Sequence, residues 1–126
     1  MLILTKLLVN QPVMSLRTGR PVATTMQAII NPTNLKIEGF YCLDPEKKNT
    51  PLILMHRDIR DILPAGLVID DYDVLAEPED LIRLKKVLEY DFSLVGKPVV
   101  TENKKRLGKI TDYATDSSSL YIQKLY

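Results

Sequence analysis

The stretch LVGKPVVTENKKRLGKITD, residues 94–112, repeats the order of features found in LVNQPVMSLRTGRPVATTM, residues 8–26. Pro12 and Pro98 align at a spacing of 86 residues, and after one additional residue in the later stretch the spacing becomes 85. The aligned residues continue downstream as three pairs: Asn31 with Asp116, Leu35 with Leu120, and Ile37 with Ile122. Self-similarity at a fixed spacing indicates a duplicated supersecondary unit.

Each copy has the pattern of a strand, a polar turn, a strand, a second polar turn and a strand. A proline opens the first apolar run of each copy, and a residue without a backbone donor suits the first position or the edge of a strand. Polar residues 17–20 and 102–106 then separate two apolar runs, as in a β-hairpin. Short strands with frequent turns predict a mainly β fold, either a small barrel or a sandwich.

Residues 77–90 break this rhythm and predict the one α-helix. Leu81, Leu84 and Leu88 are spaced to share one helical face, and Pro78 fits the first turn. We expect an amphipathic helix that packs on a barrel, the alternative being a helix dedicated to a partner. The expected division of the chain is a first unit over residues 1–76, a linking helix over 77–90, and a partial second unit over 91–126.

Residues 94–112, with Asp116 after them, resemble the PRC-barrel family in their order of Pro-Val-Val, polar turn, Leu-Gly-Lys-Ile and aspartate. Residues 58–60 and 66–69 also resemble the later half of such a barrel, whereas the first copy departs from the family by having Gln27 in the place of Asp112. The resemblance implies a small PRC-type β-barrel that is duplicated, with an incomplete second copy and one linking α-helix.

The PRC-barrel family includes the cytoplasmic domain of the photosynthetic reaction-centre H subunit and the C-terminal domain of ribosome maturation factors. The resemblance therefore implies a non-catalytic protein-interaction or adaptor module with a protein partner. It leaves open an RNA- or ribosome-associated assembly factor, although maturation factors carry a separate N-terminal domain for which 126 residues leave no room.

The net charge and the number of cysteines indicate which ligands and which compartment the chain favours. Seventeen basic and sixteen acidic side chains give a net charge of +1, so no strong field steers the chain towards nucleic acid or anionic lipid. The single cysteine, Cys42, favours a reducing compartment and hence a cytoplasmic location. No apolar run approaches the roughly 18 residues of a spanning helix, and we expect no membrane insertion.

No residue pattern here is typical of catalysis, a metal site or a cofactor. We expect His56, the only histidine, to be exposed at a strand end, and Cys42 to lie in the core rather than act as a nucleophile. Residues 58–61 either orient a partner carboxylate or form an internal ion pair or a turn hydrogen-bond network, and residues 70–73 lack the glycine and terminal glutamate of a calcium loop. We expect the chain not to be an enzyme, a small enzyme with an unrecognised carboxylate site being a third alternative.

Basic residues gather in and around the second hairpin, at Lys97, Lys104, Lys105, Arg106 and Lys109. Such a turn is either simply solvated or contacts RNA phosphates or an acidic protein. No aromatic residue interleaves with these side chains, which argues against a stacking platform for single strands. The candidate partner contacts, on the rims of the two hairpins, are Arg17, Arg20, Lys104, Lys105 and Arg106.

The second copy is shorter than the first, since 35 residues follow Asp91 and the last of them form an apolar run. A half barrel leaves an open sheet edge, which attracts another strand. Either the chain was cut there or another chain completes the barrel. We expect a homodimer formed through residues 91–126, the alternative being a monomer in which these residues fold back on the first barrel.

Overall fold

A computed structural model describes residues 1–46, 51–90, 92–100 and 102–126, and the fold in these ranges is mainly β, as the sequence predicts. The strands in chain order are β1 (Leu2–Leu4), β2 (Pro12–Ser15), β3 (Pro21–Asn31), β4 (Lys36–Leu43), β5 (Leu52–Met55), β6 (Ile59–Leu63), β7 (Gly66–Ile69), β8 (Pro98–Val100), β9 (Arg106–Lys109), β10 (Tyr113–Asp116) and β11 (Ile122–Leu125). The helical segments are 3-10 helices at Thr5–Leu7, His56–Asp58, Tyr72–Val74, Pro78–Asp80 and Ile82–Leu84, and the α-helix α1 (Lys85–Tyr90).

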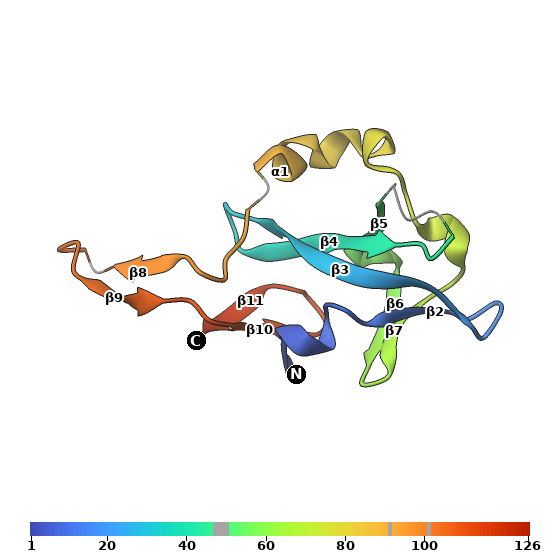
Figure 1. The fold of residues 1–126 in the computed structure, drawn as a ribbon, viewed down its shortest axis with the longest axis horizontal. Helices are drawn as coiled ribbons and strands as arrows, with labels where there is room; N and C mark the ends of the chain where they lie inside the picture. Colours follow the sequence, from blue (N-terminus) through green and yellow to red (C-terminus); the bar gives the residue numbers. More distant parts are fainter. Residues whose placement is uncertain (47–50, 91, 101) are drawn as a thin grey trace.

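The largest sheet has the order β5-β4-β3-β2-β7-β6 and curls into a half-barrel (Figure 1). Its neighbouring strands are antiparallel except β2 and β7, which run parallel. The long strand β3 shifts its register against β4 twice, between Thr25 and Gln27 and between Ile29 and Ile30. Because β-bulges bend a strand and increase its twist, these shifts favour the curl of the sheet.

Strands β8 to β11, which follow the helix, form two smaller sheets: β8 pairs with β9, and β10 and β11 join the N-terminal β1 in the order β1-β10-β11. The three-stranded sheet joins the half-barrel where β4 and β11 begin, at an antiparallel bridge between Lys36 and Tyr121. Two reciprocal backbone bonds flank this bridge: Ile37 N–H donates to the Leu120 carbonyl at 2.8 Å, and Ile122 N–H donates to the Leu35 carbonyl at 2.9 Å.

The β2–β3 and β8–β9 hairpins have the same strand register. Val13 lies opposite Ala23 in the first hairpin, and Val99 lies opposite Gly108 in the second. Both hairpins shift register directly after this pair. The sequence alignment at a spacing of 85 to 86 residues places these same positions together.

The turns around the hairpins also recur at this spacing. Asn10 and Gly96 both have a positive φ, of 55° and 91°, and their N–H groups donate to the carbonyls of Thr25 and Ile110, each at 2.7 Å. The positive φ requires a residue that tolerates the left-handed region, which asparagine and glycine do. The turns at Asn10 and Gly96 therefore share their local backbone geometry.

A second pair of equivalent turns contains leucine in the left-handed region, where non-glycine residues are uncommon. Leu35 has a φ of 54° and Leu120 a φ of 58°, and the N–H groups donate to the carbonyls of Asn31 and Asp116, each at 2.9 Å. Leu120 is fully buried, and Leu35 packs against the same core. Burial of these two side chains offsets the backbone strain of about 1–2 kcal/mol per residue.

One apolar cluster runs through both units. It contains Phe40, Leu54 and Leu67 from the first unit, all fully buried, together with Leu94 and Tyr113 from the second. The core is therefore continuous across the junction at which β4 and β11 meet.

The helical segment differs from the sequence prediction of one helix over residues 77–90. The α-helix spans only Lys85–Tyr90, and two short 3-10 helices precede it. Leu81 separates these with a φ of −105° and a ψ of 68°, which is not helical. The amphipathic pattern still holds, because Leu84 is buried against Ile29 and Ile53 on the outer face of the sheet. Among the described residues no helix is long and apolar enough to cross a membrane.

Candidate docking surface

Strand β11 is the last strand of its sheet in the described part of the chain, whereas its counterpart β4 has β5 as an outer neighbour. Phe40 on β4 lies opposite Leu54 on β5, and both side chains are fully buried. The position equivalent to Phe40 on β11 is Leu125, which is 45% exposed. The apolar side chain at this position therefore lacks the cover that β5 provides in the first unit.

Strand β8 shows the same contrast with its counterpart β2. Val13 on β2 pairs with Leu67 on the parallel strand β7, and both are fully buried. Strand β8 has only β9 as a neighbour within the described ranges; its Val99, the equivalent of Val13, is half-buried against the core, and the next residue, Val100, is 56% exposed. Leu107 on β9 is also mostly exposed, at 66%. The second unit thus presents two edges, β8 and the part of β11 that follows Ile122, that no described strand covers, and we call these strands the open edges.

The five candidate partner contacts do not lie on one surface. Arg17 and Arg20 flank the β2–β3 turn at one end of the long axis, and Lys104, Lys105 and Arg106 lie in the β8–β9 hairpin at the other end (Figure 1). All five side chains are exposed. Arg17 is also paired within the chain, since its Nη1 lies 3.5 Å from the Asp71 carboxylate. The five residues therefore form two separate groups, of which the basic residues of the second hairpin lie beside the open edges, and their role as partner contacts stays a prediction.

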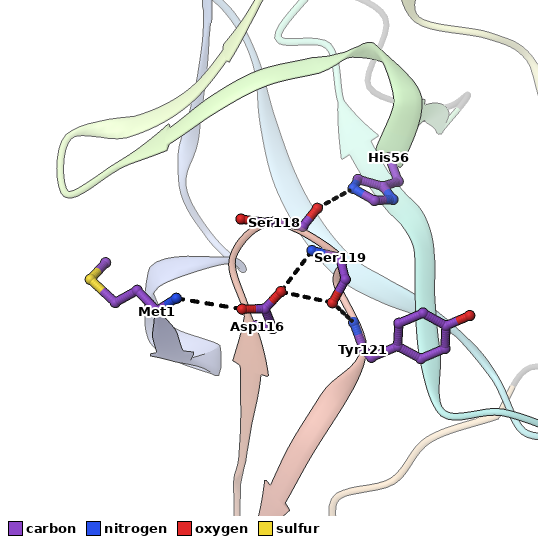
Figure 2. Close-up of polar contacts among 6 residues, drawn as sticks. All are labelled: Met1, His56, Asp116, Ser118, Ser119 and Tyr121. Carbon is purple, nitrogen blue, oxygen red and sulfur yellow. Dashed lines mark hydrogen bonds and ion pairs between the residues drawn. The ribbon is translucent and has the colours of Figure 1, made fainter.

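The turn between β10 and β11 is held by Asp116 (Figure 2). Its Oδ2 accepts hydrogen bonds from the Ser119 backbone at 2.9 Å and from the Ser119 hydroxyl at 2.8 Å, and the Met1 amino group lies 3.4 Å from Oδ1. The Ser119 bonds, the backbone one first, lower the pKa of Asp116 to about 2. This carboxylate thus fixes the start of the open edge β11.

Acid is expected to destabilise this turn through Asp116. The folded-state pKa lies below the unfolded value of about 3.9, so the stabilising contribution is complete above that value and is lost as the pH falls towards about 2. We expect the Tm to fall less between pH 5 and pH 2 in Asp116→Asn than in the wild type, with Glu79→Gln, an exposed carboxylate, as the control. Equal acid-induced falls in Tm for the wild type and Asp116→Asn would contradict this assignment.

His56 lies directly after the end of β5, as expected, but it links the two units rather than standing exposed. Its side chain is half-buried, and Nε2–H donates to the Ser118 carbonyl at 3.0 Å (Figure 2). The sequence gives no signal for this bond, because its two residues belong to different units. Cys42, by contrast, is fully buried on β4, and its assignment to the core is confirmed.

The acidic segments of the first unit are occupied by bonds within the chain. Arg60 Nε and Nη2 donate to the two carboxylate oxygens of Asp70 at 2.7 and 2.8 Å, which is the internal ion pair that the sequence left among its alternatives. Asp71 accepts from the Tyr72 N–H and from the Ser15 hydroxyl. Among the described residues no group of three or more histidine, cysteine, aspartate or glutamate side chains could hold a metal ion.

A scan against protein-family models finds no match to this chain, and no curated protein matches it. The open edges and the basic group beside them are thus the features from which a function is to be inferred.

Proposed function

We propose that this chain is a non-catalytic protein-docking module built from two PRC-barrel-type units, one complete and one open. The recurrence of hairpin register and turn geometry at a spacing of 85 to 86 residues supports a duplication. The observation that carries the docking role is the exposure of Leu125 at a position where the first unit buries Phe40. The buried thiol of Cys42 fits our proposal of a cytoplasmic location.

Affinity capture from the native cell lysate tests this role. We expect wild-type protein to retain a reproducible partner, and Leu125→Lys on the open edge to lose it. The control is Ile82→Lys, since Ile82 is 82% exposed on a 3-10 helix that lies outside the open edges. Equal retention by Leu125→Lys and the wild type would reject docking through this edge.

The exposed basic group of the second hairpin favours one alternative, an RNA-associated assembly factor. Neutralised phosphates release counterions, so RNA affinity would fall steeply with salt, and removal of each phosphate-binding cation would reduce the logarithmic salt slope by about 0.7 to 0.9. If the role is protein docking, we expect Lys104→Gln/Lys105→Gln/Arg106→Gln to weaken partner retention at physiological salt without abolishing it. Salt-sensitive binding of single-stranded RNA that this triple variant abolishes would favour the alternative.

A further inference from the structure

In the first unit, the strands that correspond to the open edges are β4 and β2, and other strands of the same unit cover both of them. A single segment supplies both covering strands, because β5 pairs with β4 and β7 pairs with β2. These two strands lie within residues 51–76, and β6 between them pairs with β7. The segment thus crosses from one edge of the three-stranded set β4-β3-β2 to the other.

The second unit has the counterpart of that three-stranded set. Strand β11 corresponds to β4 and β8 corresponds to β2, while β9 and β10 together correspond to the long strand β3. Hydrogen bonds join the pieces, since Ile110 N–H donates to the Lys97 carbonyl at 2.9 Å and Thr111 N–H donates to the Tyr126 carbonyl at 2.6 Å. At the start of β11 the Ile122 N–H donates to the Leu35 carbonyl, and beyond this bond no described segment of the chain pairs with the outer side of β8 or β11.

The charges of the two units indicate the net charge of a segment that would bind to the open edges. Residues 51–76 contain five aspartates and two arginines, and Asp71 of this segment lies 3.5 Å from Arg17 beside the β2–β3 turn. The corresponding β8–β9 hairpin carries Lys104, Lys105 and Arg106, and residues 91–126 contain six basic and four acidic side chains. A covering segment with net negative charge is therefore complementary to the second unit, as residues 51–76 are to the first.

We propose that the open edges form a strand-acceptor site for an acidic, two-stranded segment of a partner protein. One strand of this segment adds antiparallel to β11 in the position of β5, and the other adds parallel to β8 in the position of β7. Main-chain hydrogen bonds along the edges supply affinity, and Leu125, Val100 and Leu107 select apolar residues at alternate positions. This inference rests on the proposed docking function and specifies the partner for it.

A second copy of the chain, the partner expected from the sequence, fits these edges less well. The segment that would fit, residues 51–76, already covers β4 and β2 in each copy. A two-fold contact through residues 91–126 would also bring together two regions that each carry a net excess of basic residues. The homodimer nevertheless stays a prediction that the same experiment decides.

The probe for this site is a synthetic peptide with the sequence of residues 51–76, titrated into the full-length chain and followed by calorimetry. We expect saturable one-to-one binding that Leu125→Lys weakens at least tenfold and Ile82→Lys leaves unchanged. A peptide in which asparagine replaces the five aspartates should bind about tenfold more weakly at low salt, with a smaller difference at 0.5 M salt.

Failure to bind, or equal binding by a peptide of scrambled sequence, would overturn the strand-acceptor site. If the peptide does not bind but Leu125→Lys still fails to retain the partner from the lysate, the proposed docking through β11 is supported. Only the acidic, two-stranded nature of the docked segment is then wrong. Light scattering that gives a mass of two chains, reduced to one by Leu125→Lys, would identify a second copy as the occupant and overturn the proposal. A mass of one chain that persists on dilution supports it.

Discussion

Replacing Cys42 with aspartate is expected to abolish cooperative thermal unfolding of the chain. Cys42 is fully buried on β4, between Thr25 on β3 and Leu52 on β5. Burial raises the pKa of its thiol to about 12, which shows how strongly this site disfavours a charge. Burying an unpaired carboxylate costs several kcal/mol, against a total stability of about 5–15 kcal/mol for a domain of this size.

Circular dichroism melts measure this effect. The control at the same site is Cys42→Ala, which keeps the position apolar and should leave a cooperative transition at a lower Tm. The control for the added charge is Ile82→Asp, where 82% exposure should limit the change to about 0.5 kcal/mol. An unchanged melt of Cys42→Asp would show that β4 does not lie in the interior of the sheet.

Local sequence signals predicted the strands and hairpins because their causes are local. Pro12 and Pro98 each open a strand, and polar turns follow both, so the alternation of apolar and polar residues was sufficient to place them. The α-helix was predicted too long because its limits depend on packing. Leu84 turns into the sheet against Ile29 and Ile53, and the chain leaves helical geometry at Leu81 before it.

Contacts between segments that are distant in the chain could not be predicted from the sequence. Arg60 lies beside Asp70 only because β6 and β7 form a hairpin in a particular register, and the sequence supplied several other carboxylates as possible partners. The bond from His56 to Ser118 requires the two units to meet at β4 and β11. The separation of the five candidate partner contacts into two groups could not be predicted from the sequence for the same reason, since hairpins of similar sequence need not lie on the same side of the molecule.

Replacing Phe40 with alanine is expected to destabilise the chain by about 3–5 kcal/mol, whereas Leu125→Ala should cost about 1 kcal/mol or less. The two residues hold equivalent positions, on β4 and β11, at the spacing of 85 residues. Phe40 is fully buried beneath Leu54 of β5, so its removal leaves a cavity that rigid neighbouring strands cannot fill. Leu125 is 45% exposed, so water already occupies much of the space around it.

Urea unfolding of both variants, at a chain concentration where light scattering shows one chain, measures the difference directly. A decrease of several kcal/mol in both variants would mean that Leu125 is covered in the free chain and that β11 is no open edge. With the peptide of residues 51–76 bound at saturation, we expect Leu125→Ala to lose more stability relative to the wild type than it does alone, because a ligand that binds more tightly stabilises the folded state more. The loss of unfolding free energy in Leu125→Ala therefore indicates whether a bound segment covers the open edge β11.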